Sequence, residues 1–488
     1  MPEYPLKEII SKRTERSKVF DLGNNKRRLV CHAKPIHYKP KGKTGWEDIS
    51  LNFQDDKHDN FIADRNKVSI GFRKDLQLYK YFGARYDYEH QFEATIKGIE
   101  LDGVERVKKD TIISVQRKSD TEVIHQLCPE IEIINRINEI SLKNFVKVSS
   151  PIEDFKIVEE LHLRGLSCSN RKEGNRYFPD EQNKFNFVDE KGELKFWINH
   201  PFFEEDSGER SQNISHSLRE VAGKLIYVKA PTQSGKDDLT LAQYPILIDT
   251  NVYYSSTSDG YVKGIQHGTW DTAHGAATGE SVSSGDSYYD LAITLNANSS
   301  PHWYQPIRAF FYFDTSNLPD DATVTGATLK IYGYSEADAS VSAQEGTQAS
   351  TLTTADFDAC NPTPTTGGGE YGHVSWATGQ YNSIVFNATG ESNINKTGIT
   401  KICCRNYERD YLDSEGPHQS QGCYFSEQAD TTYDPKLEID YTEPSTNMQI
   451  NIGDAWKEVD SMQINIGDVW KDVTGVQQNI GDTWKTVF

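Results

Sequence analysis

Adjacent aromatic residues recur along this sequence and could form platforms for sugar binding. An aromatic ring presents a flat face on which the apolar side of a sugar ring can stack. The candidate binding residues are Tyr253, Tyr254, Tyr288, Tyr289, Trp303, Tyr304, Trp456, Trp470 and Trp484. The alternative is simple packing, because in a β-sandwich one member of an adjacent pair faces the core and the other lies on the surface.

Carboxylates are abundant, but their pattern does not indicate catalysis. A glycosidase needs two carboxylates in defined positions, and among 72 Asp and Glu residues any pairing can be found. The sequence contains no G-x-S-x-G, P-loop or H-E-x-x-H motif. It therefore predicts a protein that is not an enzyme and has no catalytic residues.

Potential metal ligands are scattered. Several cysteines and histidines fall in two regions of the chain: Cys403, Cys404, Cys423, His373 and His418 in one, His32 and His37 in the other. Zinc ligands normally come in C-x₂₋₄-C pairs, so buried thiols are favoured and no metal or cofactor is predicted. Acidic turns at 285–290, at 319–321 and in the C-terminal repeats could hold Ca²⁺ through oxygen ligands. Alternatively, their Asp side chains satisfy the turn backbone.

The charge of the chain is large, negative and uneven. A net charge of −20 argues against nucleic acid as a partner, because phosphate neutralisation needs a basic face. Residues 1–43 nevertheless carry twelve Lys or Arg against four acids. This pattern predicts a basic arm at residues 1–18 that docks on an acidic partner, or else a solvated, frayed terminus.

Seven cysteines form no regular framework, which predicts folding in a reducing cytoplasm with thiols as small buried hydrophobes. The start of the chain lacks the apolar region of a signal peptide. No apolar stretch approaches the roughly 18 residues of a membrane span, so no membrane insertion is expected. A surface-type protein without export signals would fit release by cell lysis.

Short runs rich in β-branched and aromatic residues, separated by turn residues, predict an all-β protein of tandem antiparallel, jelly-roll-like β-sandwiches. The expected parts are an N-terminal β region at 19–230 (possibly two subdomains), a linker at 231–243, a second sandwich at 244–442 and a linker at 443–447. Residues 306–316 and 322–335 form the clearest strand pair, joined by the turn at 317–321. Residues 130–140 could be a strand or a short helix, and 337–370 resembles a long surface loop.

Three copies of one 14-residue unit close the chain at 448–488. Each unit contains N-I-G-D-x-W-K and is expected to form a β-hairpin. An isolated hairpin is marginal in water, so the three are expected to stack their Trp rings and to bury further surface against other copies of the chain. A trimer is the favoured oligomer.

Residues 308–335, with strands ending in F-D-T-S and A-T-L-K-I-Y and the turn L-P-D-D-A-T-V between them, resemble the DNRLRE-type β-sandwich, which is related to carbohydrate-binding modules. The motif D-P-K-L-E-I-D-Y-T at 434–442 resembles its closing strand. This resemblance covers about 244–442 and implies a sandwich fold.

Segments at 17–30, 35–49, 192–208 and 243–251 are similar to β-rich regions that precede such modules in Rhs-like and phage-encoded surface proteins. The tyrosine-aspartate repeats and toxin of Rhs proteins are absent from the sequence. The terminal repeats resemble Trp-containing repeats that close phage tail and fibre proteins.

Together these features predict a structural phage virion protein (tail fibre, spike or capsid decoration) that contacts other virion proteins and adheres to host-surface glycan. Its expected location is the virion. The alternative is a bacterial surface-associated carbohydrate-binding protein without catalytic activity, located outside the cell or on its surface. A polysaccharide-degrading enzyme is a third, weaker possibility.

Overall fold

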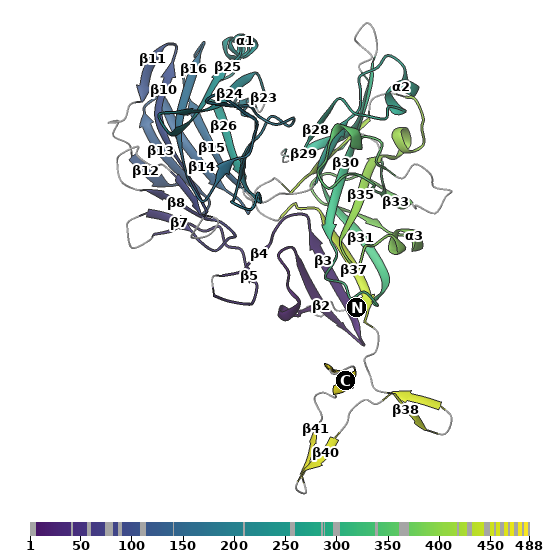
Figure 1. Ribbon diagram of the computed structural model, residues 1–488. Coiled ribbons are helices and arrows are strands. Elements are labelled where there is room, and N and C mark those ends of the chain that lie inside the picture. Colours follow the sequence, from purple (N-terminus) through teal and green to yellow (C-terminus); the bar gives the residue numbers. More distant parts are fainter. Residues whose placement is uncertain are drawn as a thin grey trace.

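The computed structural model describes most of residues 6–443 and the strands of three C-terminal hairpins. The described ranges are 6–40, 42–55, 60–73, 82–85, 90–107, 114–139, 141–207, 210–253, 259–284, 286, 288–295, 303–336, 340–360, 370–416, 419–426, 432–443, 449–452, 455–458, 463–466, 469–472, 477–480 and 483–486. Antiparallel strands dominate, so the all-β prediction is confirmed. Figure 1 shows two lobes side by side.

The first lobe (residues 50–253) packs two antiparallel sheets face to face. One sheet runs in the order β18 (Lys172–Glu173), β19 (Arg176–Tyr177), β24 (Ile214–Val221), β25 (Lys224–Pro231), β16 (Phe155–Arg164), β10 (Gln91–Leu101), β9 (Phe82–Arg85), β8 (Ser69–Arg73), β7 (Asn60–Ala63) and β6 (Gln54–Asp55), with β11 (Val104–Val107) beside β10. The other runs β12 (Ser114–Arg117), β13 (Glu122–Cys128), β14 (Ile131–Ile137), β15 (Ser141–Val148), β26 (Ile246–Tyr253), β21 (Leu194–Ile198), β20 (Phe185–Val188) and β17 (Ser167–Cys168), with β22 (Phe203–Glu204) and β23 (Arg210–Ser211) beside β26.

The second lobe (residues 6–33 and 259–442) is discontinuous in sequence. Its sheet runs β1 (Lys7–Glu8), β2 (Ser17–Gly23), β3 (Lys26–His32), β37 (Lys436–Thr442), β31 (Thr323–Glu336), β36 (Gln419–Tyr424), β29 (Tyr288–Leu295), β30 (Tyr304–Asp314), β35 (Ile399–Asn406), β32 (Ser340–Glu345) and β33 (Glu370–Ser375). β27 (Gly260–Lys263), β28 (Ser281–Ser283) and β34 (Tyr381–Val385) pair at its side. The chain therefore begins in this lobe, builds the first lobe and returns.

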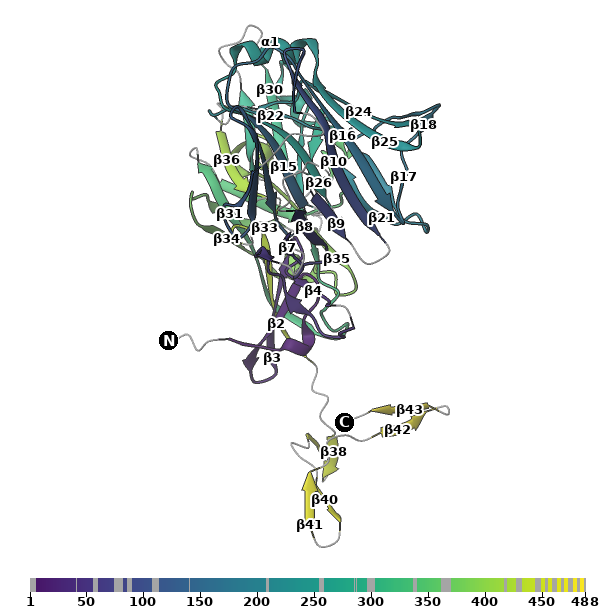
Figure 2. The same cartoon turned by 90° about the vertical axis from the view of Figure 1, so that its left-hand side faces the viewer.

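Short elements complete the fold. These are the helices α1 (Gln233–Leu241), α2 (Trp270–His274) and α3 (Ala388–Ser392), the 3₁₀ turns Ile10–Lys12 and Thr354–Asp356, the π-turn Tyr407–Tyr411, and the hairpin of β4 (His37–Tyr38) and β5 (Glu47–Asp48). Figure 2, turned by 90°, shows α1 at the end of the first lobe far from the C-terminal hairpins.

The structure moves the predicted domain boundaries. The predicted linker 231–243 is largely α1, because Leu239 packs into the first-lobe core at 1% exposure. β26, assigned from sequence to the second sandwich, pairs along its whole length with β15 of the first lobe. The hairpin β2–β3, assigned to the N-terminal region, pairs through β3 with β37 over seven residues.

The predicted basic arm is packed in its described part, residues 6–18. β1 pairs with β2, and the side chain of Arg13 is only 10% exposed and forms an ion pair with Glu8 at 2.6 Å. The alternative of a frayed terminus is therefore wrong for residues 6–18, whose charges meet intramolecular carboxylates. Docking on an acidic partner stays a prediction.

The structure also decides three local predictions. Residues 131–137 are strand β14, since Ile131, Ile133 and Ile137 all enter one core. The expected surface loop 337–370 contains β32 and a capped turn at Thr354–Asp356. β30 and β31 form as expected but do not pair with each other: β30 pairs with β27, β29 and β35, and β31 with β34, β36 and β37.

Candidate functional site

Six tyrosines gather on the outer face of the second lobe, where β29, β36, β31 and β34 lie side by side. Tyr288 on β29 pairs with Tyr424 on β36, and Tyr332 on β31 pairs with Tyr381 on β34. The pairing of Gly333 with Cys423 places Tyr332 next to Tyr424. One tyrosine from each of four neighbouring strands therefore stands at the same level of the sheet, and their neighbours Cys423 and Ile331 face the core, as the strand period of two requires. β31, β34 and β36 are labelled in Figure 2, and β29 in Figure 1.

The rings are in mutual contact along this row. The ring centroids of Tyr288 and Tyr334 are 4.1 Å apart and stacked, and that of Tyr424 lies 5.5 Å from Tyr334, edge to face. Tyr332 lies 5.9 Å from Tyr424 and 5.2 Å from Tyr381. Tyr433 completes the group at 4.4 Å from Tyr332 and 4.9 Å from Tyr424. These six residues are called the tyrosine platform below.

Backbone hydrogen bonds fix the inner half of the tyrosine platform. The hydroxyl of Tyr332 donates to the carbonyl of Gly379 at 2.6 Å, and that of Tyr381 donates to the carbonyl of Thr432 at 2.7 Å. The ammonium of Lys436 lies 4.7 Å from the centroid of the Tyr381 ring. These contacts hold the rings in place before any ligand arrives, which reduces the ordering cost of binding.

The outer half is open to solvent. Tyr288 and Tyr334 are 39% and 40% exposed, and they are among the few large hydrophobic residues of the described chain that are so exposed. Burial, then the neighbouring Tyr433, Tyr288 and Tyr332, raise the pKa of Tyr424, so its hydroxyl keeps its proton at neutral pH. The arrangement offers apolar ring faces with phenolic hydroxyls at their edges, the combination that suits the two-sided chemistry of a sugar ring.

Of the predicted aromatic pairs, only Tyr288 belongs to the platform. Tyr289 points inward and stacks on Tyr261 with centroids 4.0 Å apart. Tyr304 is at the start of β30, where its hydroxyl donates to Glu415, and Trp303 directly precedes it, partly buried. The predicted sugar contacts at Tyr289, Trp303 and Tyr304 are thus not brought together with Tyr288.

For the remaining predicted binding residues the structure describes the backbone alone, and Tyr254 is not described. Tyr253 ends β26 in the first lobe, and Tyr254 lies outside the described residues. Trp456, Trp470 and Trp484 occupy equivalent positions opposite Asn451, Asn465 and Asn479 in three separate two-stranded sheets. These sheets are β38 (Gln449–Ile452) with β39 (Ala455–Glu458), β40 (Gln463–Ile466) with β41 (Val469–Asp472), and β42 (Gln477–Ile480) with β43 (Thr483–Thr486). Stacking of the three units stays a prediction.

Sequence reasoning missed five platform residues: Tyr332, Tyr334, Tyr381, Tyr424 and Tyr433. A signal was present in I-Y-G-Y at 331–334, because residues two apart on a strand share a face. Tyr381 on β34 and Tyr424 on β36 could not have been found this way, since a local sequence pattern does not show which distant strands pair.

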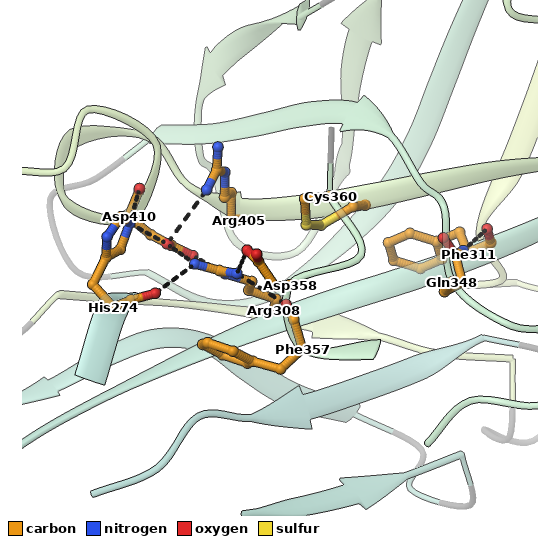
Figure 3. The surroundings of a disulfide bond; sticks show 10 residues. His274, Arg308, Phe311, Gln348, Phe357, Asp358, Cys360, Arg405 and Asp410 are labelled. Atoms are coloured by element: carbon orange, nitrogen blue, oxygen red, sulfur yellow. Dashed lines mark hydrogen bonds and ion pairs between the residues drawn. A yellow bond between two sulfur atoms is a disulfide. The ribbon is translucent and has the colours of Figure 1, made fainter. Parts of the chain in front are cut away.

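A second cluster, of charged groups, is buried between α2, β30 and the turn at Tyr407–Tyr411. Arg308, 1% exposed, contacts Asp410 through Nη2 at 2.8 Å and through Nε at 2.9 Å. His274 lies 3.1 Å from the same carboxylate, and Figure 3 shows these side chains near Cys360. Burial opposes ionisation, but Arg308 and then His274 hold the pKa of Asp410 well below its usual range. We interpret this cluster as a structural ion-pair network, since a bidentate Arg–carboxylate pair satisfies its own buried charges.

A disulfide joins Cys360 and Cys403 beside this network (Figure 3). The bond corrects the prediction that all seven cysteines are thiols in a reducing cytoplasm, because disulfides persist in oxidising surroundings. Cys404 and Cys423 are buried free thiols, as expected. Among the described residues no group of three or more His, Cys, Asp or Glu side chains could hold a metal ion. His418 lies outside them, and so do residues 285 and 287 of the acidic turn at 285–290 and the Gly-Asp turns of the repeats. Within the same part of the chain, no helix is long and apolar enough to cross a bilayer.

Comparison with known proteins identifies bacterial relatives. The chain is 25% identical over 348 residues to the tRNA nuclease WapA of Bacillus subtilis (strain 168), and 24% identical over 340 residues to the tRNA3(Ser)-specific nuclease WapA of Bacillus spizizenii. Each match spans 67% of this chain but only 13% of the relative. The Wall-associated protein of Geobacillus stearothermophilus is 27% identical over 161 residues, which is 32% of this chain and 63% of the relative. No protein-family model matches the chain.

These names correct two predictions. The matched relatives are named as wall-associated proteins and tRNA nucleases, so the interpretation as a phage virion, tail-fibre or decoration protein is wrong, and virion location has no support. The prediction that the chain is not an enzyme is contradicted as well, by the relatives named as nucleases. The alternative of a bacterial surface-associated protein agrees better with these relatives.

Proposed function

We propose that this chain is a glycan-binding part of a bacterial cell-surface protein, and that the tyrosine platform is its binding face. The observation that carries the proposal is the stacked, 39–40% exposed pair Tyr288 and Tyr334 at the end of a row of ordered rings. The name of the Geobacillus relative supports a location in the cell wall. The disulfide Cys360–Cys403 supports a location outside the reducing cytoplasm.

Binding to one platform would be modest in free energy. We take as the scale for one ring–sugar contact the value for an aromatic pair, about 0.5–1.5 kcal/mol beyond the area it buries. Two exposed rings would therefore contribute about 1–3 kcal/mol, which is a factor of roughly 5 to 150 in affinity. A cell wall repeats its glycan many times, so several copies of the chain on one surface would bind much more tightly than one.

The test is retention of the purified chain on insoluble peptidoglycan, with cellulose and chitin as comparison polymers. The variant Tyr288→Ala/Tyr334→Ala should lose roughly 5-fold to 150-fold in apparent affinity while its thermal unfolding stays close to that of the original chain. The matched control is Tyr38→Ala, since Tyr38 lies on β4, away from the platform. Equal retention of the double variant and the control would refute the platform as the binding face.

Cleavage of tRNA is a second candidate function, favoured by the names of the Bacillus relatives. Since each match spans 13% of those proteins, this activity can belong to the matched segment or to the rest. Incubation of the purified chain with bacterial tRNA, followed by denaturing electrophoresis, distinguishes the two. Discrete fragments would assign the activity to this chain, and intact tRNA would assign it to the remaining parts of the relatives.

We also propose that residues 244–442 form a DNRLRE-like sandwich and that the chain assembles as a trimer. A trimer would multiply the number of platforms presented to one wall surface. Sedimentation of the chain with and without residues 447–488 measures whether the repeats hold copies together. Monomers in both cases would refute the trimer.

A further inference from the structure

A cleft separates the two lobes and lies apart from the tyrosine platform. It consists of two adjoining hollows of about 990 and 730 Å³. Both hollows are lined by Glu181, Gln182, Lys184, Asn199, Ser284 and Leu352, four residues of the first lobe and two of the second. Shared walls make the two hollows halves of one elongated cleft.

The floor of the cleft is the outer face of β20 and β21. Phe185, Phe187, Phe196 and Ile198 are buried in the first-lobe core at 0–1% exposure. Strand alternation turns the residues between them outward. Asn186 and Trp197, a directly paired couple, therefore line the cleft, with Asn199 two residues beyond Trp197. The floor thus carries one indole ring and two amide side chains.

The rim of the cleft is an ordered turn. The carboxylate of Asp180 accepts hydrogen bonds from the backbone N–H groups of Gln182 and Lys184, each at 2.9 Å. Its second oxygen accepts from the side-chain amide of Asn186 at 2.7 Å. The turn is therefore tied to the floor, and the cleft keeps its shape without a ligand.

The two lobes are held together across the cleft. Gln182 donates from Nε2 to the carbonyl of Leu352 at 3.3 Å, and Arg210 of the first lobe lies 3.9 Å from Asp286 of the second. On the second-lobe wall, the ammonium of Lys263 sits 4.4 Å from the centroid of the Tyr289 ring. The contacts of Gln182 with Leu352 and of Arg210 with Asp286 therefore connect the two walls of the cleft.

The lining chemistry defines the class of ligand. The charged lining includes both signs: the acids are Asp180, Glu181, Glu280 and Asp286, and the bases are Arg171, Lys184 and Lys263. A nucleic acid would need a cationic surface, and a peptide that binds as an added strand would need a long free sheet edge, whereas the sheet edge nearest this floor, β17, has two residues. Amides and carboxylates beside aromatic rings, of which Trp197 lies on the floor, suit the hydroxyl and acetamido groups of a carbohydrate.

We propose that the cleft between the lobes is a second ligand site, which binds an extended oligosaccharide of neutral or N-acetylated sugars with one ring stacked on Trp197. This goes beyond the proposed platform function, because a cleft encloses a single soluble chain whereas an open platform contacts the surface of a polymer.

The test is isothermal titration calorimetry of the full chain with N-acetylchitohexaose and cellohexaose, and with a hexapeptide of serine and asparagine as the probe for peptide binding. We expect saturable binding of at least one sugar and none of the peptide. Trp197→Ala should weaken sugar binding at least tenfold, and Glu181→Ala, an exposed rim substitution that leaves the core intact, several-fold. Trp46→Ala is the matched control, because Trp46 lines neither hollow.

The variants distinguish binding in the cleft from binding on the tyrosine platform. Tyr288→Ala/Tyr334→Ala should leave oligosaccharide titration unchanged, and Trp197→Ala should leave retention on peptidoglycan unchanged. The cleft proposal is overturned if neither sugar binds, if the peptide binds instead, or if both Trp197→Ala and Glu181→Ala bind the sugar as the original chain does.

Discussion

The ammonium of Lys34 lies 3.1 Å from the carboxylate of Asp434, and both side chains are fully buried. Lys34 follows β3, and Asp434 precedes β37 in the second lobe. The same ammonium lies 3.0 Å from Glu139, which connects β14 and β15 of the first lobe. Burial alone would lower the pKa of Lys34, but Asp434 and Glu139 raise it above its ordinary value. A single buried cation therefore joins the two lobes.

Removal of the Lys34 ammonium should weaken the coupling between the two lobes. Lys34→Ala leaves two carboxylates buried without their partner, and breaking a buried pair in this way costs about 3–5 kcal/mol. We expect urea unfolding, followed by tryptophan fluorescence and circular dichroism, to shift to lower urea and to separate into two transitions as the lobes uncouple. Lys43→Ala, which removes an exposed pair with Glu47, should change stability by about 0–1 kcal/mol. Equal effects of the two variants would contradict the role of Lys34.

The N-terminal hairpin should be required for the second lobe although hundreds of residues separate it from its partner. Leu29 on β3 pairs with Ile439 on β37, and both are 0% exposed. Leu29→Ala should reduce the free energy of unfolding by about 2–5 kcal/mol. Hydrogen exchange should accelerate at residues 436–442 in particular. Leu6→Ala, at a position 46% exposed, serves as the control and should leave exchange in β37 unchanged.

Local pattern predicted strands well and their partners poorly. Apolar runs placed β30 and β31 correctly, but β30 is buried on both faces, between the main core and a smaller core that contains Phe310 and Cys403. The sequence did not reveal that second core, because three of its members, Leu352, Phe357 and Cys360, fall in a segment that was expected to be a loop. The tyrosine platform could not be predicted for the same reason. The strand period of two places Tyr332 and Tyr334 on one face of β31, but Tyr288 and Tyr424 join them only because distant strands pair.

The disulfide predicts a difference between oxidised and reduced protein. Cys360 and Cys403 enclose a sequence separation of 43 residues, and loss of a native disulfide typically costs about 2–5 kcal/mol. Cys360→Ser/Cys403→Ser should therefore unfold at a lower temperature than the oxidised chain. Thiol titration in denaturant should count five cysteines in oxidised protein, since five are free. Seven reactive thiols in protein secreted into an oxidising medium would contradict the bond.

Acid should destabilise the first lobe through His216. Burial, then the nearby His200 and Lys229, lower the pKa of His216 to about 3, and its Nδ1 lies 3.0 Å from the Tyr227 hydroxyl. Between pH 6.5 and about 3 the unfolded chain binds a proton that the folded chain excludes, so stability falls as pH falls through this window. His216→Gln should flatten the decline in unfolding free energy measured by urea titration from pH 7 to pH 4. An equally steep decline in that variant would assign the effect to other groups.

The tyrosine platform should require glycine at position 333, because the neighbouring backbone leaves no room for a Cβ atom there. Gly333 lies between Tyr332 and Tyr334, and a Cβ atom there would meet the backbone oxygen of Ala377 at 2.1 Å, a contact that no side-chain rotation can relieve. Gly333→Ala should therefore push β31 away from the 377–380 turn, lower the melting temperature and weaken retention on peptidoglycan. Gly326 on the same strand is the matched control, since its added Cβ would meet nothing closer than 3.9 Å. Gly326→Ala should keep both stability and retention on peptidoglycan. If Gly326→Ala lost as much retention as Gly333→Ala, binding would depend on the strand as a whole and not on the placement of its tyrosines.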